Sequence, residues 1–255
     1  MVTDTKPIIH QVGLILIGDE LLSGRREDRH LSQTLATLEG SGIAIAWVQM
    51  VGDERQRLAR FLAFSREGKE PVFCFGGIGA TPDDHTRQAA GIAWNKPLVR
   101  HPVAAQTLVD KFGEEAFPHR IRMGEFPQGA GLIPNPINDI SGFYLDDHHF
   151  LPGFPDMAQP MLSWVIGHRY QQPNSSEVVR GLTVKKAREG DMIPILAEIE
   201  ERFPGVISFS LPGGQGSHRI EMGVKGREVL QVESAFQMLQ ERLREVGLTE
   251  MVLEP

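Results

Sequence analysis

Short apolar runs alternate with amphipathic stretches along the first part of the chain. Runs that are almost continuously apolar are typical of strands covered on both faces, and three runs predict such strands: Val12–Ile17, Ile43–Val51 and Val72–Phe75. Apolar residues at steps of three and four predict helices at Asp28–Gly40, with Leu31, Leu35 and Leu38 on its buried face, and at Arg55–Glu67. This alternation favours βαβ units and a mostly parallel, doubly wound α/β sheet.

The following residues predict a helix, an irregular stretch, a hairpin and a closing helix. A helix is expected at Pro102–Phe112, and the many prolines and glycines of Glu114–Ile140 indicate loops and short strands. Gly142–Leu151 has the pattern of a hairpin, and Met157–Tyr170 that of a helix. The hairpin tip, Asp146-Asp147-His148-His149, contains metal-binding residue types. Neighbouring strand residues point to opposite faces, however, so a solvated turn is the preferred interpretation.

A polar stretch then divides the chain. Gln171–Ser176 contains a proline and is the predicted linker between a domain at residues 1–170 and one at 177–255. The second domain is expected to be a small α+β module, with a turn at Pro212–Gly216. Its predicted strands are Val178–Lys185, Gly205–Leu211 and Ser217–Gly223, and its predicted helices are Asp191–Arg202 and Glu228–Val246.

Composition narrows the class of protein. A 255-residue chain with 41% hydrophobic and 23% charged residues is typical of a globular protein with one or two domains. No apolar run approaches the ~20 residues of a membrane helix, and the first residues lack the pattern of a signal peptide. The single cysteine, Cys74, excludes an intrachain disulfide and favours a cytoplasmic location, and its apolar strand predicts a core residue. A net charge of −7 argues against nucleic-acid binding.

The candidate chemistry is concentrated after the third predicted strand, within Pro71–Ala90. The glycines Gly76, Gly77 and Gly79 let the backbone turn sharply and approach a ligand closely. Thr81 is expected to cap a helix that starts at the next residue, and Asp84, three residues after Thr81, completes a capping-box pattern. A strand, a glycine turn and a helix start form the place where open α/β sheets bind ligands.

Electrostatics suggest what kind of ligand this turn binds. Free N–H groups at a helix start attract phosphate, yet Asp83 and Asp84 place two carboxylates there, which would repel it. A divalent cation, with Mg²⁺ as the expected one, removes the conflict by bridging carboxylate and phosphate. The alternative is that Asp84 only caps the helix and Asp83 only complements the helix dipole.

A second acidic loop follows the first predicted strand. Gly18-Asp19-Glu20-Leu21-Leu22-Ser23-Gly24 has glycines at both ends and two carboxylates between them. The carboxyl ends of parallel strands meet at one edge of a sheet, so this loop is expected near Asp83 and Asp84.

Five segments, in this order, resemble the molybdopterin-binding-domain superfamily, and most closely the N-terminal part of the competence/damage-inducible protein A (CinA) family. They are Ile17–Gly24, Val51–Glu54, Gly76–Thr86, Met123–Asn135 and Leu151–Met157. The resemblance covers residues 8–165 and implies a three-layer α/β/α fold. The second module resembles the small KH-like domain that follows in CinA proteins. Relatives either bind molybdopterin or hydrolyse the pyrophosphate of ADP-ribose-like or FAD-like dinucleotides with a divalent metal.

The resemblance also implies roles for individual residues. Asp83 and Asp84 are the expected catalytic and metal-binding residues. The expected ligand- and phosphate-binding residues are Gly18, Asp19, Glu20, Ser23, Gly24, Asp28, His30, Gly76, Gly77, Gly79 and Thr81. A homo-oligomer, dimer or trimer, is expected because relatives assemble in this way.

The chain also departs from the family pattern. Ala80 replaces a usual proline, which should change only the stiffness of the loop. At Arg29-His30 the family more often has asparagine after a small polar residue, so this pair indicates a different phosphate or base contact. No signature of the nicotinamide-mononucleotide deamidase domain is present, so deamidation is not expected.

The sequence is compatible with three functions. The first is metal-dependent hydrolysis of a nucleotide pyrophosphate bond, for which only His30 is a candidate general base. The second is binding of molybdopterin or a nucleotide without turnover, and the third is an interaction protein with a vestigial pocket. The two acidic loops argue against the third, because clustered carboxylates repel one another unless a ligand offsets the repulsion.

Overall fold

The computed structural model describes residues 6–173, 177–185, 188–213 and 219–253. The chain forms two compact units, residues 1–174 and 175–255. The division falls inside the stretch predicted as a linker, of which residues 174–176 lie outside the described residues. The predicted turn at Pro212–Gly216 is likewise described only up to residue 213.

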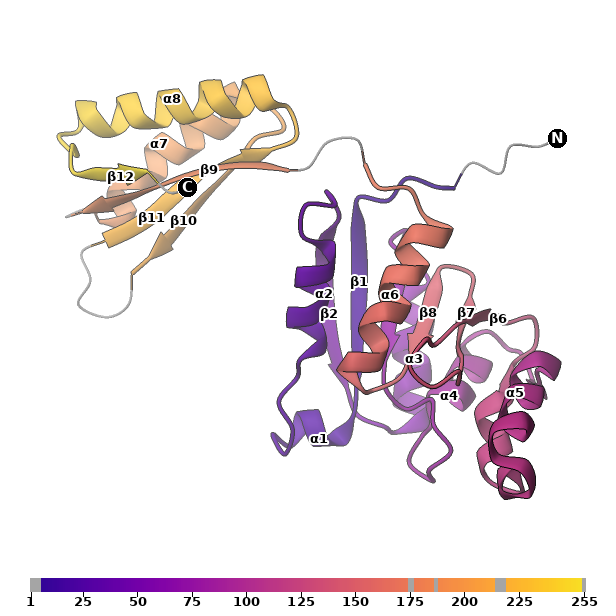
Figure 1. The fold of residues 1–255 in the computed structure, drawn as a ribbon. Helices are drawn as coiled ribbons and strands as arrows, with labels where there is room; N and C mark the ends of the chain where they lie inside the picture. Colours follow the sequence, from indigo (N-terminus) through magenta and orange to yellow (C-terminus); the bar gives the residue numbers. More distant parts are fainter. Residues whose placement is uncertain (1–5, 174–176, 186–187, 214–218, 254–255) are drawn as a thin grey trace, which may run out of the picture. The chain divides into compact units, whose positions relative to one another are not determined.

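A six-stranded sheet forms the centre of the first unit, in the order β2-β1-β3-β8-β7-β6 (Figure 1). The first four of these strands run parallel, and β7 and β6 continue the sheet antiparallel. The expectation of a mostly parallel α/β sheet is therefore confirmed. The strands are β1 (Gln11–Ile17), β2 (Ala44–Val51), β3 (Val72–Phe75), β6 (Gly131–Ile133), β7 (Gly142–Leu145) and β8 (His148–Leu151).

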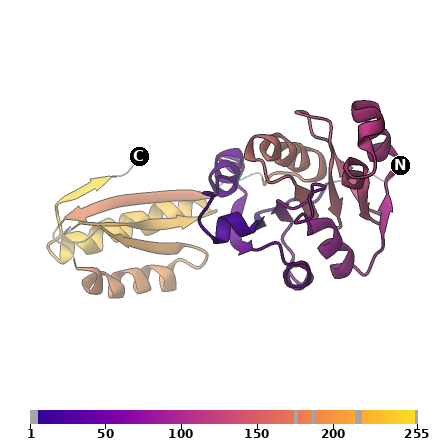
Figure 2. The ribbon, with the colours of Figure 1, turned by 90° about the horizontal axis from the view of Figure 1, so that it is seen from below.

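Helices cover both faces of this sheet, which gives three layers (Figure 2). On one face α2 (His30–Leu38) packs beside α6 (Pro155–Arg169), and on the other α3 (Arg55–Ser65) packs beside α4 (Thr86–Ala93). The short helix α1 (Asp19–Leu22) follows β1 directly. Outside the three layers are α5 (Pro102–Phe112), the 3₁₀ turns η1 (Gly113–Ala116) and η2 (Arg120–Gly124), and the two-stranded sheet of β4 (Leu98–Arg100) and β5 (Glu125–Pro127).

The central strands are apolar throughout because both of their faces are buried. In β3, Phe73 and Phe75 belong to the core beneath α2 and α6, whereas Val72 and Cys74 belong to the core beneath α3 and α4. Cys74 has no exposed surface, and burial raises the pKa of its thiol. The expectation of a core cysteine is confirmed, and a neutral buried thiol is a poor nucleophile.

Two local predictions are wrong. The buried face of α2 consists of His30, Thr34 and Leu38, while Leu35 is 54% exposed. The hairpin at Gly142–Leu151 is confirmed, but only its two aspartates form the turn; both histidines lie in β8 and are buried. The histidines are buried because β8 is an interior strand of the sheet, which the local pattern does not reveal.

The second unit is an α+β module with one antiparallel sheet, in the order β10-β11-β9-β12. The chain order β-α-β-β-α-β is that of a split βαβ motif. The predicted separate α+β module is confirmed with one additional short strand, β12, while its likeness to a KH domain stays a prediction. The elements are β9 (Val178–Lys185), α7 (Glu189–Arg202), β10 (Ile207–Pro212), β11 (Arg219–Gly226), α8 (Val229–Glu245) and β12 (Met251–Leu253).

Within the described ranges, none of the helices combines the length and apolar character that crossing a bilayer requires.

The buried histidine His148 predicts acid-sensitive folding of the first unit. Burial, helped by the charge of Arg66, lowers the pKa of His148 to about 4 from its ordinary 6.5. Between these pH values the unfolded chain binds a proton that the folded chain does not, so the free energy of unfolding falls as pH falls from 6.5 to 4. His148→Gln should flatten this dependence by up to about 1.4 kcal/mol per pH unit in urea titrations.

The control for this prediction is a histidine on the surface. His119 is exposed, so His119→Gln should keep the wild-type slope. An unchanged slope in the His148→Gln protein would contradict the prediction.

Candidate functional site

A cavity of about 480 Å³ lies at the edge of the first sheet where β1, β2, β3 and β8 end. Its walls come from the loops that follow these four strands, together with Met123 and the segment between Asn135 and Ser141. Loops far apart in the sequence meet here because the strands of a parallel sheet end on the same side. This is the place that the sequence predicted for a ligand.

The glycine loop forms one wall of the cavity. Gly76 and Gly77 have φ angles of 112° and 65°, which favour glycine, and a Cβ on Gly76 would lie 2.3 Å from the carbonyl oxygen of Ile17. In the part of the chain that the structure describes, the backbone N–H groups of residues 77–80 donate no hydrogen bond. All four residues line the cavity. Consecutive free N–H groups in a concave turn are suited to binding an anion.

Asp83 and Asp84 also line the cavity, but they do not lie in a helix. The prediction of a helix start at Thr81 is wrong: α4 begins at Thr86, and the residues before it form a turn. The Oδ2 atom of Asp84 accepts hydrogen bonds from the N–H of Thr81, at 2.8 Å, and from the Thr81 hydroxyl. Thr81 and Asp84, which match a capping box in the sequence, therefore close this turn.

The two aspartates differ in their surroundings. Asp84 is partly buried and bound to Thr81, whereas Asp83 is exposed. Hydrogen bonding by Thr81 and by its own backbone lowers the pKa of Asp83, which therefore stays charged at neutral pH. The pair thus offers one carboxylate open to solvent and one that shapes the turn.

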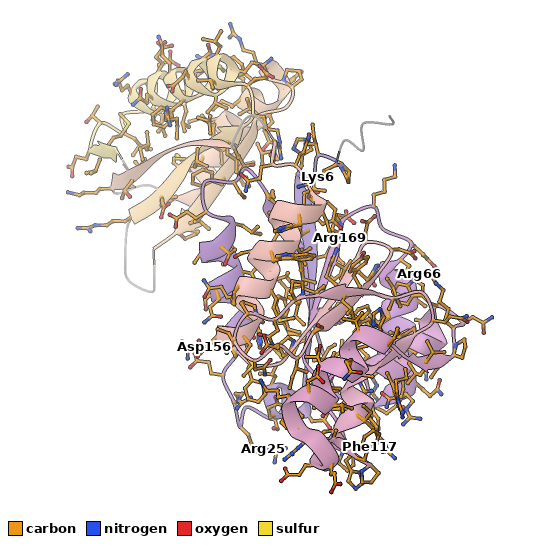
Figure 3. The ribbon with its side chains drawn as sticks, turned by 45° about the vertical axis from the view of Figure 1, so that its right-hand side comes forward. Lys6, Arg25, Arg66, Phe117, Asp156 and Arg169 are labelled. Atoms are coloured by element: carbon orange, nitrogen blue, oxygen red, sulfur yellow. The ribbon has the colours of Figure 1, made fainter. Side chains whose placement is uncertain are left out.

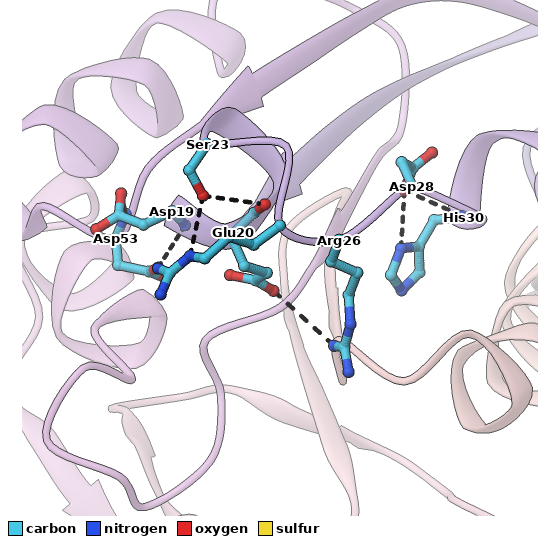
Figure 4. A network of polar contacts seen from close by, with 8 residues as sticks. Asp19, Glu20, Ser23, Arg26, Asp28, His30 and Asp53 are labelled. Carbon is cyan, nitrogen blue, oxygen red and sulfur yellow. Dashed lines mark hydrogen bonds and ion pairs between the residues drawn. The ribbon is translucent and has the colours of Figure 1, made fainter.

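The second acidic loop reaches the same cavity through Gly18 and Glu20. Behind them, Asp19 joins this loop to the loop after β2, because the N–H of Asp19 donates to Asp53 Oδ2 at 2.9 Å. The N–H of Asp53 in turn donates to Asp19 Oδ1 at 3.2 Å (Figure 4). Ser23 donates to the carbonyl of Glu20 at 3.3 Å. Ser23 and Gly24 are outside the lining of the cavity.

Asp53 is a cavity residue that the sequence-based site omitted. Burial raises its pKa, and the nearby charges of Asp19, Glu20 and Asp83 raise it further. In the sequence, Asp53 belongs to the segment Val51–Glu54. This segment carries part of the family resemblance but implies no site residue. A carboxylate with a raised pKa that lies in a cleft beside other carboxylates is typical of cation or proton chemistry.

The structure places Asp28 and His30 outside the cavity lining. Asp28 caps α2 by accepting from the N–H groups of His30, at 3.1 Å, and Leu31, at 3.0 Å, and its Oδ1 lies 3.0 Å from His30 Nδ1. Figure 4 shows this pair apart from Asp19 and Asp53. The His30 ring is 7% exposed and packs against Phe75, and burial lowers its pKa. Nothing in this arrangement supports a ligand contact or a general base at His30.

Another part of the cavity lining was not predicted. Phe154 and Met157, at the start of α6, present apolar surface, and Asn135 and Asn138 add side-chain amides. Phe154 is 58% exposed. An apolar, partly aromatic surface beside amides suits a flat heteroaromatic ring. Asn135, Phe154 and Met157 belong to segments that carry only the family resemblance, and Asn138 belongs to none of them, because apolar residues and amides do not by themselves indicate a site.

The side chains of the first unit limit how a metal ion could be held. Within the described residues, no three His, Cys, Asp or Glu side chains form a group that could hold a metal ion. A complete protein cage is therefore absent from this part of the chain. Mg²⁺ is usually held by only one or two carboxylates plus phosphate oxygens, so Asp83 and Asp84 fit a cation that arrives together with a phosphate ligand.

Several known proteins are similar to this chain in sequence. A family model described as "Probable molybdopterin binding domain" matches residues 13–172. A "CinA-like protein" of Geobacter metallireducens is 33% identical over 208 residues, which are 77% of this chain and 50% of that protein. A "Putative competence-damage inducible protein" of Caldanaerobacter subterraneus is 27% identical over 248 residues, 91% of this chain and 58% of that protein. This chain spans about half the length of such relatives.

A solved structure shares the fold of the first unit. It is titled "protein CinA with unknown function" and comes from Thermoplasma acidophilum. The similarity has a TM-score of 0.58 and 22% sequence identity, and covers 62% of this chain and 97% of that one.

Proposed function

The chain belongs to the molybdopterin-binding domain family as a CinA-like member, and from this premise we propose that its cavity binds a dinucleotide and hydrolyses its pyrophosphate bond with a divalent metal. ADP-ribose-like and FAD-like compounds are the proposed substrate class. They combine a diphosphate, which suits the glycine loop, with a flat base, which suits the wall around Phe154.

One observation carries this proposal: anion-binding and cation-binding groups share one cavity. The unpaired N–H groups of residues 77–80 lie beside the carboxylates of Asp83 and Asp84, and Glu20 and Asp53 line the same cavity. Neither a bare phosphate nor a bare cation would satisfy all of these groups. A diphosphate with a bound Mg²⁺ satisfies both, which is why this ligand class is preferred.

The residues of the chain have distinct tasks in this proposal. The N–H groups of residues 77–80 would bind diphosphate oxygens and stabilise the negative charge that develops on them during hydrolysis. Asp83 and Asp84 would hold the cation, which supplies Lewis acidity and lowers the pKa of a bound water when present. Phe154 and Met157 would position the base.

Hydrolysis can be tested directly with the full chain. We expect AMP release from ADP-ribose or FAD in the presence of Mg²⁺ or Mn²⁺, and its loss when EDTA is added. Absence of AMP under all metal conditions, with a folded protein verified by circular dichroism, would remove the catalytic part of the proposal.

Binding without turnover is the second candidate, and the absence of a preformed group of three metal ligands among the described residues favours it. In that case molybdopterin or a nucleotide would occupy the same cavity and be retained. Calorimetric binding of ADP-ribose without AMP, or pterin fluorescence that copurifies with the protein, would select this function over hydrolysis.

A further inference from the structure

A buried arginine lies directly beneath the glycine loop. Arg87, in the first turn of α4, is only 2% exposed. Its Nη2 donates to the carbonyl of Gly79 at 2.5 Å, and its Nη1 donates to the carbonyls of Arg122 and, at 3.3 Å, Glu125. Its Nε is buried and has no hydrogen-bond partner among the described residues. This residue does not line the cavity and was not singled out in the sequence.

We propose that Arg87 is a positioning residue for anion binding: it fixes the orientation of the glycine loop and places a buried positive charge behind it. This inference rests on the proposed function, because it assumes that the loop binds a phosphate group. It adds a determinant of affinity that lies outside the cavity itself.

The geometry of the peptide bond links the Arg87 contact to the direction of a loop N–H group. In a trans peptide, the carbonyl and the following N–H point in opposite directions. Because Arg87 binds the carbonyl of Gly79 from the side of α4, the N–H of Ala80 points away from α4. Ala80 lines the cavity, so a peptide held in this way presents a donor, not an acceptor, to an anion.

Thr86, the neighbouring residue of α4, holds two earlier peptides of the glycine loop in the same way. The Thr86 hydroxyl donates to the carbonyl of Gly76 at 2.9 Å, and its N–H donates to the carbonyl of Gly77 at 3.0 Å. The N–H groups of Gly77 and Ile78 are therefore also turned away from α4. Two consecutive residues, Thr86 and Arg87, thus hold three carbonyls of the loop on the side of the protein interior.

The charge of Arg87 also favours an anion at the glycine loop. A buried guanidinium is costly unless an anion compensates it, yet the polar partners of Arg87 are uncharged carbonyls. No carboxylate of the described residues forms an ion pair with Arg87: the nearby Glu125 is paired with Arg100 at 3.4 Å, and Asp84, whose charge also acts on Arg87, accepts from Thr81. A phosphate bound to the loop would add to the negative charge that these two carboxylates place near Arg87. If Arg87 only connected α4 to residues 122–125 through hydrogen bonds, an uncharged donor would be sufficient.

The test uses the full chain with two substitutions, Arg87→Met and Arg87→Lys, and inorganic pyrophosphate and ADP-ribose as probes in calorimetry. Arg87→Met removes the charge and the hydrogen bonds, and should weaken binding of both probes about 10- to 100-fold, the usual range for hydrogen bonds to charged groups. Arg87→Lys keeps the charge but loses the planar fork, and should recover part of this affinity.

Arg66→Met is the matched control. Arg66 also donates to a backbone carbonyl, that of Ala93 at 2.7 Å, and stacks on Trp94. In Figure 3 it lies well apart from Arg25, the residue that follows the second acidic loop. This variant makes the same change in net charge and should bind both probes with wild-type affinity. A folded Arg87→Met protein with wild-type affinity would overturn the inference, and so would an equal loss in Arg66→Met.

Failure of the proposed function gives a different result. If the wild-type chain binds neither probe, the proposed phosphate site is wrong. The positioning role of Arg87 is then tested by crystal structures of the Arg87→Lys and Arg87→Met proteins. We expect the Gly79–Ala80 peptide to rotate in Arg87→Met and to stay in place in Arg87→Lys. An unrotated peptide in Arg87→Met would show that Arg87 does not position the loop.

Discussion

Replacing Asp83 and Asp84 together by asparagine is expected to lower metal-dependent AMP release from ADP-ribose by about 100-fold or more, the scale of losing a group that stabilises developing charge. Asparagine keeps the size and one acceptor oxygen of each side chain but removes both negative charges. The turn at Thr81 should therefore persist while the affinity for a divalent cation falls. The measurement is the initial rate of AMP release as a function of Mg²⁺ concentration, with circular dichroism to verify folding.

Glu54→Gln provides the control for this prediction. Glu54 caps α3 by accepting from the N–H groups of Gln56 and Arg57, each at 2.8 Å, and it does not line the cavity. The change from acid to amide is the same, on an exposed side chain next to Asp53. An equal loss of activity in Glu54→Gln would show that the effect follows from losing any negative charge near the cavity. Wild-type activity of the Asp83→Asn, Asp84→Asn protein would remove both aspartates from the mechanism.

Gly76→Ala is expected to cost about 3–5 kcal/mol of stability, from a disfavoured φ and an overpacked contact combined. The φ of 112° is unfavourable for alanine, and its Cβ would lie 2.3 Å from the backbone oxygen of Ile17, in β1. Because β1 is an interior strand, bonded to β2 on one side and β3 on the other, it should hold its place and the glycine loop should shift. Thermal unfolding should occur about 6–20 °C lower, given 2–4 °C per kcal/mol for a domain of this size, and pyrophosphate binding should be lost.

Gly113→Ala separates the two causes. Gly113 has a φ of 55°, and an added Cβ would meet no atom within 4 Å. With a ψ of −132°, Gly113 lies outside the left-handed helical region, so its substitution should cost only the backbone strain, about 1–3 kcal/mol, and leave ligand binding intact. Equal destabilisation by Gly76→Ala and Gly113→Ala would show that close approach to β1 is unimportant.

The site shows where local sequence patterns succeed and where they fail. The glycine loop and the pair Asp83–Asp84 could be located from the sequence because glycines and paired acids after an apolar run are a local signal. The same local signal misplaced the start of α4, since Thr81 and Asp84 form the hydrogen bonds of a tight turn instead of those of a helix cap. Short polar turns and helix starts use the same residue types, so their sequences overlap.

Other members of the site have no local signal. Asp53 faces the cavity because β2 ends beside β1, and Phe154 faces it because β8 ends beside β3. His30 resembled a ligand in the sequence, yet α2 turns it towards Phe75 and α6 packs over that core. Arg87 is a charged residue in a helix, which usually indicates a solvated face, and only its burial reveals its contacts.

Local sequence patterns are enough to predict the alternation of strands and helices, the apolar centre of the sheet, the separate second module and the two acidic loops. Each of these follows from periodicity, turn chemistry or charge within one short segment. The three-dimensional packing is needed to know which face of α2 is buried, that both histidines of β8 lie in the core, and which loops surround the cavity. These features depend on which strands become neighbours, and that choice is made by packing between segments distant in the chain.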